Sequence, residues 1–311
     1  MIELITMVAP VFGVVAVGFF VRRAGLVGDR GTKRVVLFVF NAAIPVMLFR
    51  TMLGTNFPAE IQWGFLLAFY GAAFLTYGAG LGVAHYGFKR PRAELAIYGM
   101  GAGFSNTVML GIPLLLGAFG EEATVPVFLI IAFHSITLLP VSVVLIQTGR
   151  GQGERSLAGL WQLLLDVLTN PIILGLTLGL IAYYFDVTLP GLIDSAIAPL
   201  AAIAIPCALI ALGLSLGGYP LSGDLKPALS MAALKLAVHP TLAWIIAVPV
   251  LGLGTPWAQV AVVMASMPSG AMVYLFGARY DAAPDVAART VLITSAMSVV
   301  TVSVWMVLMG A

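Results

Sequence analysis

Long apolar runs, separated by short charged or Pro/Gly-rich breaks, fill the sequence and restrict what it can fold into. Hydrophobic residues make up 61% of the 311 residues and charged residues only 9%, whereas about 25% of an ordinary soluble domain is charged. A membrane-spanning helix needs about 20 apolar residues, so this length has room for about ten. We therefore expect an all-α polytopic membrane protein with ten transmembrane helices. The predicted spans are 4–22, 33–53, 61–86, 94–117, 123–147, 159–184, 193–216, 227–252, 256–278 and 286–309.

The charge balance and the cysteine content exclude several functions. Fifteen Lys and Arg nearly balance thirteen Asp and Glu, so the basic surface that nucleic acid requires is missing. The single cysteine, Cys207, leaves no disulfide framework and too few thiolates for a metal site. The sequence shows neither a catalytic triad nor a metal-ligand spacing. We expect no enzyme activity, no cofactor, no metal and no nucleic-acid partner.

Basic residues concentrate in alternate loops and predict the orientation of the chain. Thirteen of the Lys and Arg residues lie in or beside the odd-numbered loops, and the even-numbered loops hold only Arg50. Cytoplasmic loops of membrane proteins carry such an excess of basic residues. We therefore expect the odd loops to face the cytoplasm and both termini to lie on the outer side.

Proline spacing predicts an inverted repeat. Residues 149–157 form the most linker-like loop and separate a first five-helix repeat, 1–148, from a second, 158–311. Because each half has an odd number of spans, the second half would lie upside down in the bilayer, as in many secondary transporters. The alternative is chance, since eighteen prolines give many pairs. The matching prolines are Pro10 and Pro171, Pro45 and Pro206, both pairs 161 residues apart, and Pro113 and Pro268, 155 apart.

Spans 4 and 9 each contain a stretch that disfavours a continuous helix. Backbone released from helical hydrogen bonding cannot face lipid, and the N-termini of half-helices attract anions. We expect the two broken helices to cross near the midplane and to form one anion-binding site. The alternative is that their glycines only allow close helix packing. The stretches are Gly99–Pro113, which includes Ser105, Asn106, Thr107 and Gly111, and Ser266–Gly270, which includes Pro268 and Ser269.

At these residues the chain resembles the auxin efflux carrier family, and the resemblance covers nearly the whole sequence. That family includes plant auxin exporters and bacterial organic-acid carriers. The order and spacing of the matching pieces make the resemblance specific. The pieces are Phe104–Leu115, Met267–Gly270 with Phe276–Tyr280 and Pro284-Asp285, Asn170-Pro171, Ala211–Leu216 and Lys235–Pro240.

The resemblance implies two inverted five-helix repeats in which the broken helices 4 and 9 cross. It also implies a scaffold of helices 1, 2, 6 and 7, a mobile transport domain of helices 3–5 and 8–10, and transport of the elevator type. Further implications are a location in the bacterial cytoplasmic membrane, a homodimer, and architectural kinship with sodium–bile acid symporters.

Polar residues at the breaks are the candidates for substrate contact. Asn106 is the strongest, and its alternative role is a helix cap or an interhelical hydrogen bond. Ser105, Thr107, Ser269 and Gly270 share this ambiguity, while Gly111, Pro113 and Pro268 are expected to shape the breaks. Asn41 either bonds the carbonyl freed by Pro45 or lines the scaffold side of the site.

Lys235 is the one cation placed well inside a predicted span. It is four residues from His239, so both side chains lie on the same side of a helix. Lys235 either contacts the anion and carries a proton, or extends along the helix to the membrane surface. His239 is a second candidate for a proton relay, and its alternative role is a hydrogen bond to a carbonyl of a neighbouring helix. His134 in span 5 is a further candidate for a proton relay, with weaker support from the sequence.

The sequence therefore predicts a secondary transporter that moves a small organic anion, such as malonate, malate or an auxin-like acid. An anion channel and a membrane sensor that does not transport are the alternatives. Sodium coupling of the bile-acid type would need carboxylate ligands, and the two breaks contain no acid. Facilitated or proton-linked movement is therefore favoured over sodium coupling.

Overall fold

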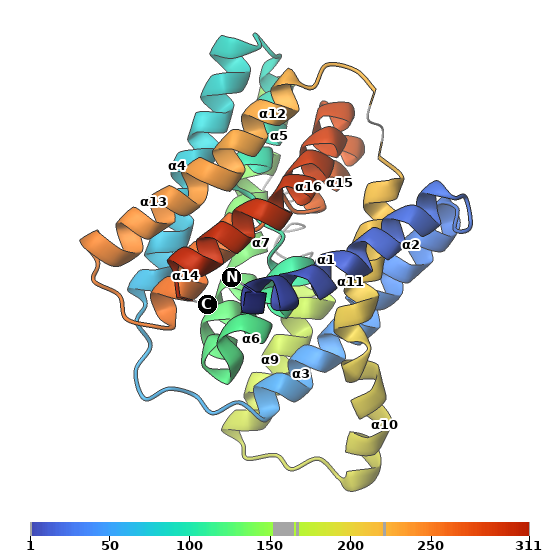
Figure 1. Cartoon of the computed structure of the whole chain (residues 1–311), viewed down its shortest axis with the longest axis vertical. Helices are drawn as coiled ribbons and strands as arrows, with labels where there is room; N and C mark the ends of the chain where they lie inside the picture. Colours follow the sequence, from blue (N-terminus) through green and yellow to red (C-terminus); the bar gives the residue numbers. More distant parts are fainter. Residues whose placement is uncertain (1, 152–164, 166–167, 220–221, 311) are drawn as a thin grey trace. The chain divides into compact units, whose positions relative to one another are not determined.

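The computed structural model describes residues 2–151, 165, 168–219 and 222–310. This part of the chain consists of helices joined by loops and has no strand (Figure 1), which confirms the all-α class for the described residues. Most of the predicted linker 149–157 and the beginning of the predicted span 159–184 lie outside the described residues.

Within the described residues, six helical segments are long and apolar enough to cross a membrane, judged by length and composition. Two further apolar helices, Pro171–Tyr184 and Trp257–Ser266, are shorter, and most of predicted span 159–184 before Pro171 lies outside the described residues. One segment, Thr107–Gly149, contains the end of predicted span 94–117 and all of predicted span 123–147. The ten-span count therefore stays a prediction. The six segments are Asp29–Leu53, Gly64–Gly87, Thr107–Gly149, Gly191–Gly217, Lys226–Val250 and Pro284–Leu308.

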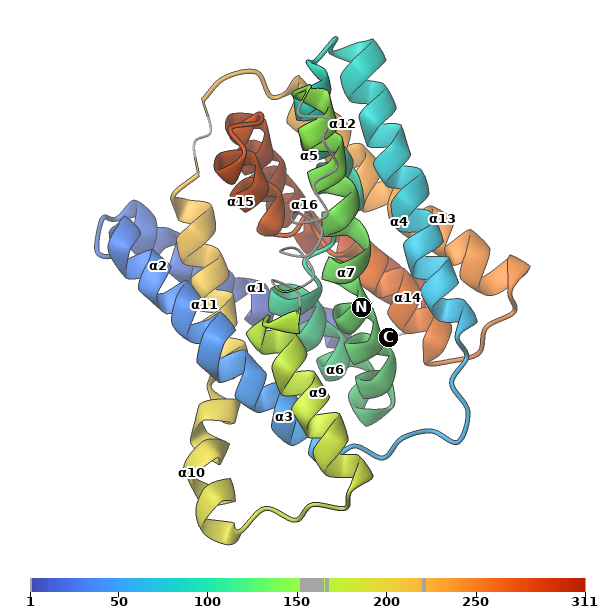
Figure 2. The same cartoon turned by 180° about the vertical axis from the view of Figure 1, so that it is seen from behind.

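The chain divides into two compact units, and the first contains residues 1–10, 60–155 and 219–311. Within it, α4 packs against α5, α13 and α14, and α16 packs against α12 and α15 (Figures 1 and 2). Its α-helices after residue 60 are α4 (Gly64–Gly82), α5 (Arg92–Gly103), α6 (Ile112–Phe119), α7 (Thr124–Gly149), α12 (Lys226–Ala233), α13 (His239–Ile245), α14 (Trp257–Ser266), α15 (Met272–Arg279) and α16 (Pro284–Leu308). Its shorter elements are η2 (Val83–Gly87), η3 (Thr107–Gly111), η4 (Gly120–Ala123), η5 (Leu234–Val238) and η6 (Ile246–Val250).

The second unit contains residues 11–59 and 156–218. Here α3 packs against α9, α10 and α11. Most of α1 (Ile2–Arg23) belongs to this unit, and its first residues belong to the other. The remaining elements are α2 (Asp29–Phe38), η1 (Val39–Ala43), α3 (Ile44–Leu53), α9 (Pro171–Tyr184), α10 (Gly191–Ala202) and α11 (Ala204–Gly217).

Prolines interrupt the helices in a regular way. The π-helical turns η1, η3 and η5 each end two residues before a proline, namely Pro45, Pro113 and Pro240. Proline has no N–H and its ring clashes with the carbonyl four residues earlier. A locally wider turn accommodates both effects, because it changes the hydrogen-bond spacing just before the proline.

Two of the three proline pairs that predicted an inverted repeat do not share one local structure, whereas Pro45 and Pro206 both lie in the first turn of a helix. Pro10 lies inside α1, whereas Pro171 is the first residue of α9. Pro113 lies at the beginning of α6, whereas Pro268 lies between two helices. The first turn of a helix tolerates proline because it does not use the N–H, whereas a proline inside a helix removes a hydrogen bond. The inverted repeat therefore stays a prediction.

Glycines four residues apart bring pairs of helices into close contact. A Cβ atom on Gly103 of α5 would lie 2.7 Å from the carbonyl oxygen of Ala73 in α4. Such small-residue spacing is typical of helix contacts in membranes, where backbones approach closely. The glycines of span 4 that lie in α5 thus allow close helix packing, which is the alternative role given for them above. The glycine pairs are Gly99 and Gly103 facing α4, Gly175 and Gly179 facing α3, and Gly213 and Gly217 facing α1.

We expect opposite effects from two glycine-to-alanine changes on α4. A Cβ on Gly80 would lie 2.7 Å from the Tyr98 carbonyl oxygen, whereas a Cβ on Gly78 would meet no atom within 4 Å. Gly80→Ala should lower the free energy of unfolding by about 1–3 kcal/mol through overpacking. Gly78→Ala should keep or raise it, because alanine favours a helix by about 1 kcal/mol over glycine. Thermal unfolding of both variants in detergent measures this, and equal midpoints would contradict the α4–α5 packing.

Candidate functional site

Two helices of the first unit are interrupted, and the interruptions pair with each other. Residues 104–106 follow the end of α5, and residues 267–271 connect α14 to α15. The segments form an antiparallel bridge between Ser105 and Ser269. The Asn106 N–H donates to the Pro268 carbonyl at 2.8 Å, and the Gly270 N–H donates to the Phe104 carbonyl at 2.9 Å. We call these two segments the paired breaks.

The sequence explains why the second segment leaves the helix. Pro268 has no N–H to donate to the carbonyl four residues before it, so helical bonding ends there. Gly270 allows the segments to approach, because a Cβ on it would lie 3.0 Å from the Phe104 ring and 3.1 Å from the Ser105 carbonyl oxygen. Pro268 thus ends the helical hydrogen bonding after α14, and Gly270 allows the second segment to pair with the first.

Asn106 combines a structural role with an unused donor. Its Oδ1 accepts a hydrogen bond from the Met109 N–H at 3.3 Å and thereby caps η3. Its amide nitrogen is buried and has no hydrogen-bond partner among the described residues, and the same holds for the Ser105 hydroxyl. A buried polar group without a partner is costly. These two groups are therefore candidates for binding a ligand.

Ser269 is held firmly by groups of the protein. Its hydroxyl donates to the Gly101 carbonyl at 2.6 Å, and its N–H donates to the Thr294 hydroxyl at 3.1 Å. The Thr294 hydroxyl itself donates to the Thr290 carbonyl at 2.7 Å. The sequence reasoning missed Thr294, and a threonine in an apolar helix gives no signal of such a distant contact.

Basic side chains bond carbonyl groups beside both breaks. Lys235 is fully buried, and its Nζ donates to the Ala265 carbonyl at 2.6 Å and lies 3.0 Å from His239 Nδ1. The His134 Nε2 lies 3.1 Å from the Ser105 carbonyl oxygen. The Lys235 side chain is therefore directed into the protein interior, in contrast to the alternative in which it extends to the surface.

The structure separates some of the other candidates from the paired breaks. Thr107 is buried at the beginning of η3. Gly111 and Pro113 lie where η3 continues into α6, several residues after the first break. Asn41 belongs to η1 in the second unit, where its side chain is exposed, and Asn170 caps α9 through a bond from the Ile172 N–H at 2.9 Å.

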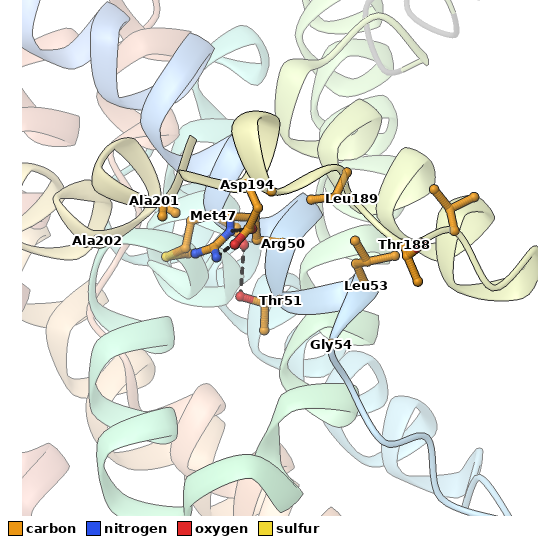
Figure 3. A pocket seen from close by; sticks show the side chains of 13 residues that line it. Met47, Arg50, Thr51, Leu53, Gly54, Thr188, Leu189, Asp194, Ala201 and Ala202 are labelled. Carbon is orange, nitrogen blue, oxygen red and sulfur yellow. Dashed lines mark hydrogen bonds and ion pairs between the residues drawn. The ribbon is translucent and has the colours of Figure 1, made fainter. Parts of the chain in front are cut away.

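A second polar region lies within the second unit, beside the end of α3 and the beginning of α10 (Figure 3). It is a cavity of about 740 Å³. The Arg50 Nε and Nη2 donate to one Asp194 oxygen at 2.9 and 2.7 Å, and the Thr51 hydroxyl donates to the Met47 carbonyl. Because the two charges compensate each other, this cavity is a weaker candidate for an anion site than the paired breaks.

Metal binding has no support in the described part of the chain. No group of three or more His, Cys, Asp or Glu side chains there is arranged to hold a metal ion. What the paired breaks offer is a set of neutral donors, the Asn106 amide and the Ser105 hydroxyl, in a region that also contains a buried lysine and histidines. Such a set suits a ligand that accepts hydrogen bonds.

Comparison with known proteins identifies the family. Residues 3–306 match the family described as membrane transport protein. The chain belongs to this family. The match confirms the resemblance to auxin efflux carriers, and it makes the protein a membrane transporter rather than an enzyme.

Three relatives cover nearly the whole chain. One, from Rhizobium meliloti, is named "Putative malonate transporter" and is 28% identical over 97% of this chain and 95% of its own. An uncharacterized transporter of Methanothermobacter thermautotrophicus is 24% identical over 97% of both chains. An uncharacterized transporter of Methanocaldococcus jannaschii is 25% identical over 94% of both.

Thr294→Val tests whether the second break depends on its hydrogen bond from Ser269. Valine cannot accept this bond, so the Ser269 N–H would be left buried without a partner, at a cost of about 1–3 kcal/mol. Thr301→Val on the same helix is the matched control, because Thr301 also bonds the carbonyl four residues before it. Thermal unfolding should show a clearly lower midpoint for Thr294→Val alone. Equal midpoints would contradict the contact.

Proposed function

We propose that the protein is a secondary transporter of small organic anions, carboxylates such as malonate, malate or auxin-like acids. The observation that carries this proposal is the pair of unused buried donors at the paired breaks, the Asn106 amide nitrogen and the Ser105 hydroxyl. They occur in a chain that belongs to a membrane transporter family, and one relative bears the name of a malonate transporter.

The chemistry of these donors fits a carboxylate. Hydrogen bonds to an ionised acceptor are shorter and stronger than those between neutral groups. A carboxylate that accepts from Asn106 and Ser105 would satisfy both donors, while the Asn106 Oδ1 keeps its bond to Met109. The buried amino group of Lys235, which can carry a positive charge, belongs to the same unit.

The mechanism we propose is alternating access by an elevator motion in a ten-helix inverted repeat. The division into two compact units supports it. The first unit contains predicted spans 3–5 and 8–10, which would form the transport domain, and the second contains most of spans 1, 2, 6 and 7, which would form the scaffold. The paired breaks lie wholly within the first unit. In this proposal, the chain lies in the bacterial cytoplasmic membrane with both termini outside.

Asn106→Asp provides a sharp test of the binding role. Aspartate keeps an oxygen for the cap of η3 but replaces the amide donor with a negative charge, which repels an anion. We expect uptake of labelled malonate and malate into proteoliposomes to fall roughly tenfold or more, the effect of losing one hydrogen bond to a charged group. A buried carboxylate without an opposite charge is costly, so the thermal midpoint should fall, and uptake is compared per amount of folded protein inserted in the liposomes.

Asn170→Asp is the matched control, because Asn170 also caps a helix through its Oδ1. It should leave uptake unchanged. Wild-type uptake by Asn106→Asp would remove Asn106 from the site. If folded wild-type protein transports none of the carboxylates tried, the proposed substrate class is wrong. Saturable uptake with counterflow would distinguish a carrier from a channel or a sensor.

The coupling ion can be tested by varying the sodium and pH gradients separately. The paired breaks contain no carboxylate, and carboxylate oxygens are among the usual ligands of hard cations. We therefore expect uptake to be the same with and without a sodium gradient, and either driven by a proton gradient or dependent on the anion gradient alone. A strict requirement for sodium would contradict this expectation.

A further inference from the structure

The second break releases carbonyl groups at the end of α14. In a continuous α-helix the Ala265 carbonyl would accept from the Ser269 N–H. That N–H donates to the Thr294 hydroxyl instead. The carbonyl of Ser266 likewise loses its helical partner, since the Gly270 N–H donates to Phe104. The C-terminal end of a helix carries partial negative charge, so carbonyls released there attract a cation.

The group at this helix end that can carry a positive charge belongs to the chain itself. Lys235 is fully buried, and its Nζ donates to the Ala265 carbonyl at 2.6 Å. Among the described residues, the ion pairs found do not include Lys235, so no carboxylate neutralises it. A buried charge without an opposite charge is expensive. The carbonyl dipoles at the end of α14 are the groups that compensate it.

His239 positions this ammonium group. Its Nδ1 lies 3.0 Å from Lys235 Nζ, and its ring packs beside Phe69 with centroids 5.6 Å apart. When Nδ1 accepts a proton of the ammonium, the ring carries its own proton on Nε2. The π-helical turn η5 contains Lys235 and ends directly before His239, so local backbone geometry fixes the side chain on the face of α14.

We propose that Lys235 is a tethered cation that holds the second break in its extended form, in the place where other carriers bind a separate metal cation. In broken-helix transporters, released carbonyls and helix C-termini commonly coordinate a coupling ion. Here an ammonium group that cannot dissociate takes that role. Lys235 is therefore a positioning residue: it acts on the break through Ala265 and does not contact the anion. Its importance for transport rests on the proposed function, but its effect on the break does not.

Hydrogen–deuterium exchange of the full-length protein in detergent tests the proposal without measuring transport. The readout is the exchange rate of peptides that cover residues 265–271. Lys235→Met keeps the length of the side chain and removes its charge. We expect roughly tenfold faster exchange in this variant, which corresponds to the loss of one charge-assisted hydrogen bond. Lys226→Gln, an exposed lysine at the beginning of α12, is the matched control and should leave the rate unchanged.

Chemical rescue distinguishes the charge from the packing of the side chain. Lys235→Ala should also exchange faster, and added ethylammonium should return its rate toward that of the wild type without affecting the wild type. Unchanged exchange in Lys235→Met would overturn the proposal. So would faster exchange in Lys235→Ala that ethylammonium does not slow, because the alkyl chain would then be the stabilising part.

The wild-type protein provides a test that does not depend on how the variants fold. Exchange of residues 265–271 should be equal in sodium and in choline buffers, because the break already contains its cation. Faster exchange in choline would show that a separate sodium ion is required and would overturn the proposal. If the wild type transports no carboxylate but behaves as expected in these exchange experiments, the proposed function fails and the role of Lys235 stands.

Discussion

Backbone N–H and C=O groups that leave a helix inside a membrane need partners within the protein, because hydrocarbon offers none. The paired breaks satisfy this requirement for each other. The N–H of Asn106 and the carbonyl of Pro268 form one bond, and the N–H of Gly270 and the carbonyl of Phe104 form the other. Other released groups bond to side chains of neighbouring helices, and this is why Thr294, His134 and Lys235 are located where they are.

Two side-chain donors at the breaks are left without a hydrogen-bond partner among the described residues, and these donors make the region a candidate site. The Asn106 amide nitrogen and the Ser105 hydroxyl are the side-chain donors at the breaks that the described residues do not satisfy. From the sequence, Ser269 is a candidate of the same rank as Ser105, yet its hydroxyl and N–H are both bonded to protein groups. Burial and hydrogen bonding thus distinguish residues that the sequence pattern treats alike.

Much of the architecture follows from apolar periodicity and from proline and glycine chemistry. The end of α3 at Leu53 and the beginning of α7 at Thr124 lie within one residue of the predicted span limits, because charged and Gly/Pro-rich segments mark the ends of apolar runs. The sequence also identifies the two irregular stretches. It does not place the first break at 104–106, since Pro113 is the stronger local signal and yet continues a helix. Contacts between distant residues, such as Lys235 with Ala265, depend on tertiary packing and have no local pattern.

The two hydrogen bonds between the breaks affect the affinity with which the carrier would bind an anion on each side of the membrane. Both segments belong to one compact unit. Separating them would expose four backbone groups to an apolar surrounding, at a cost of several kcal/mol for each unsatisfied group. The binding groups would therefore remain assembled throughout a cycle. A carrier that keeps its binding groups intact would present nearly the same intrinsic affinity to both sides of the membrane, and the direction of net flux would then follow the gradients.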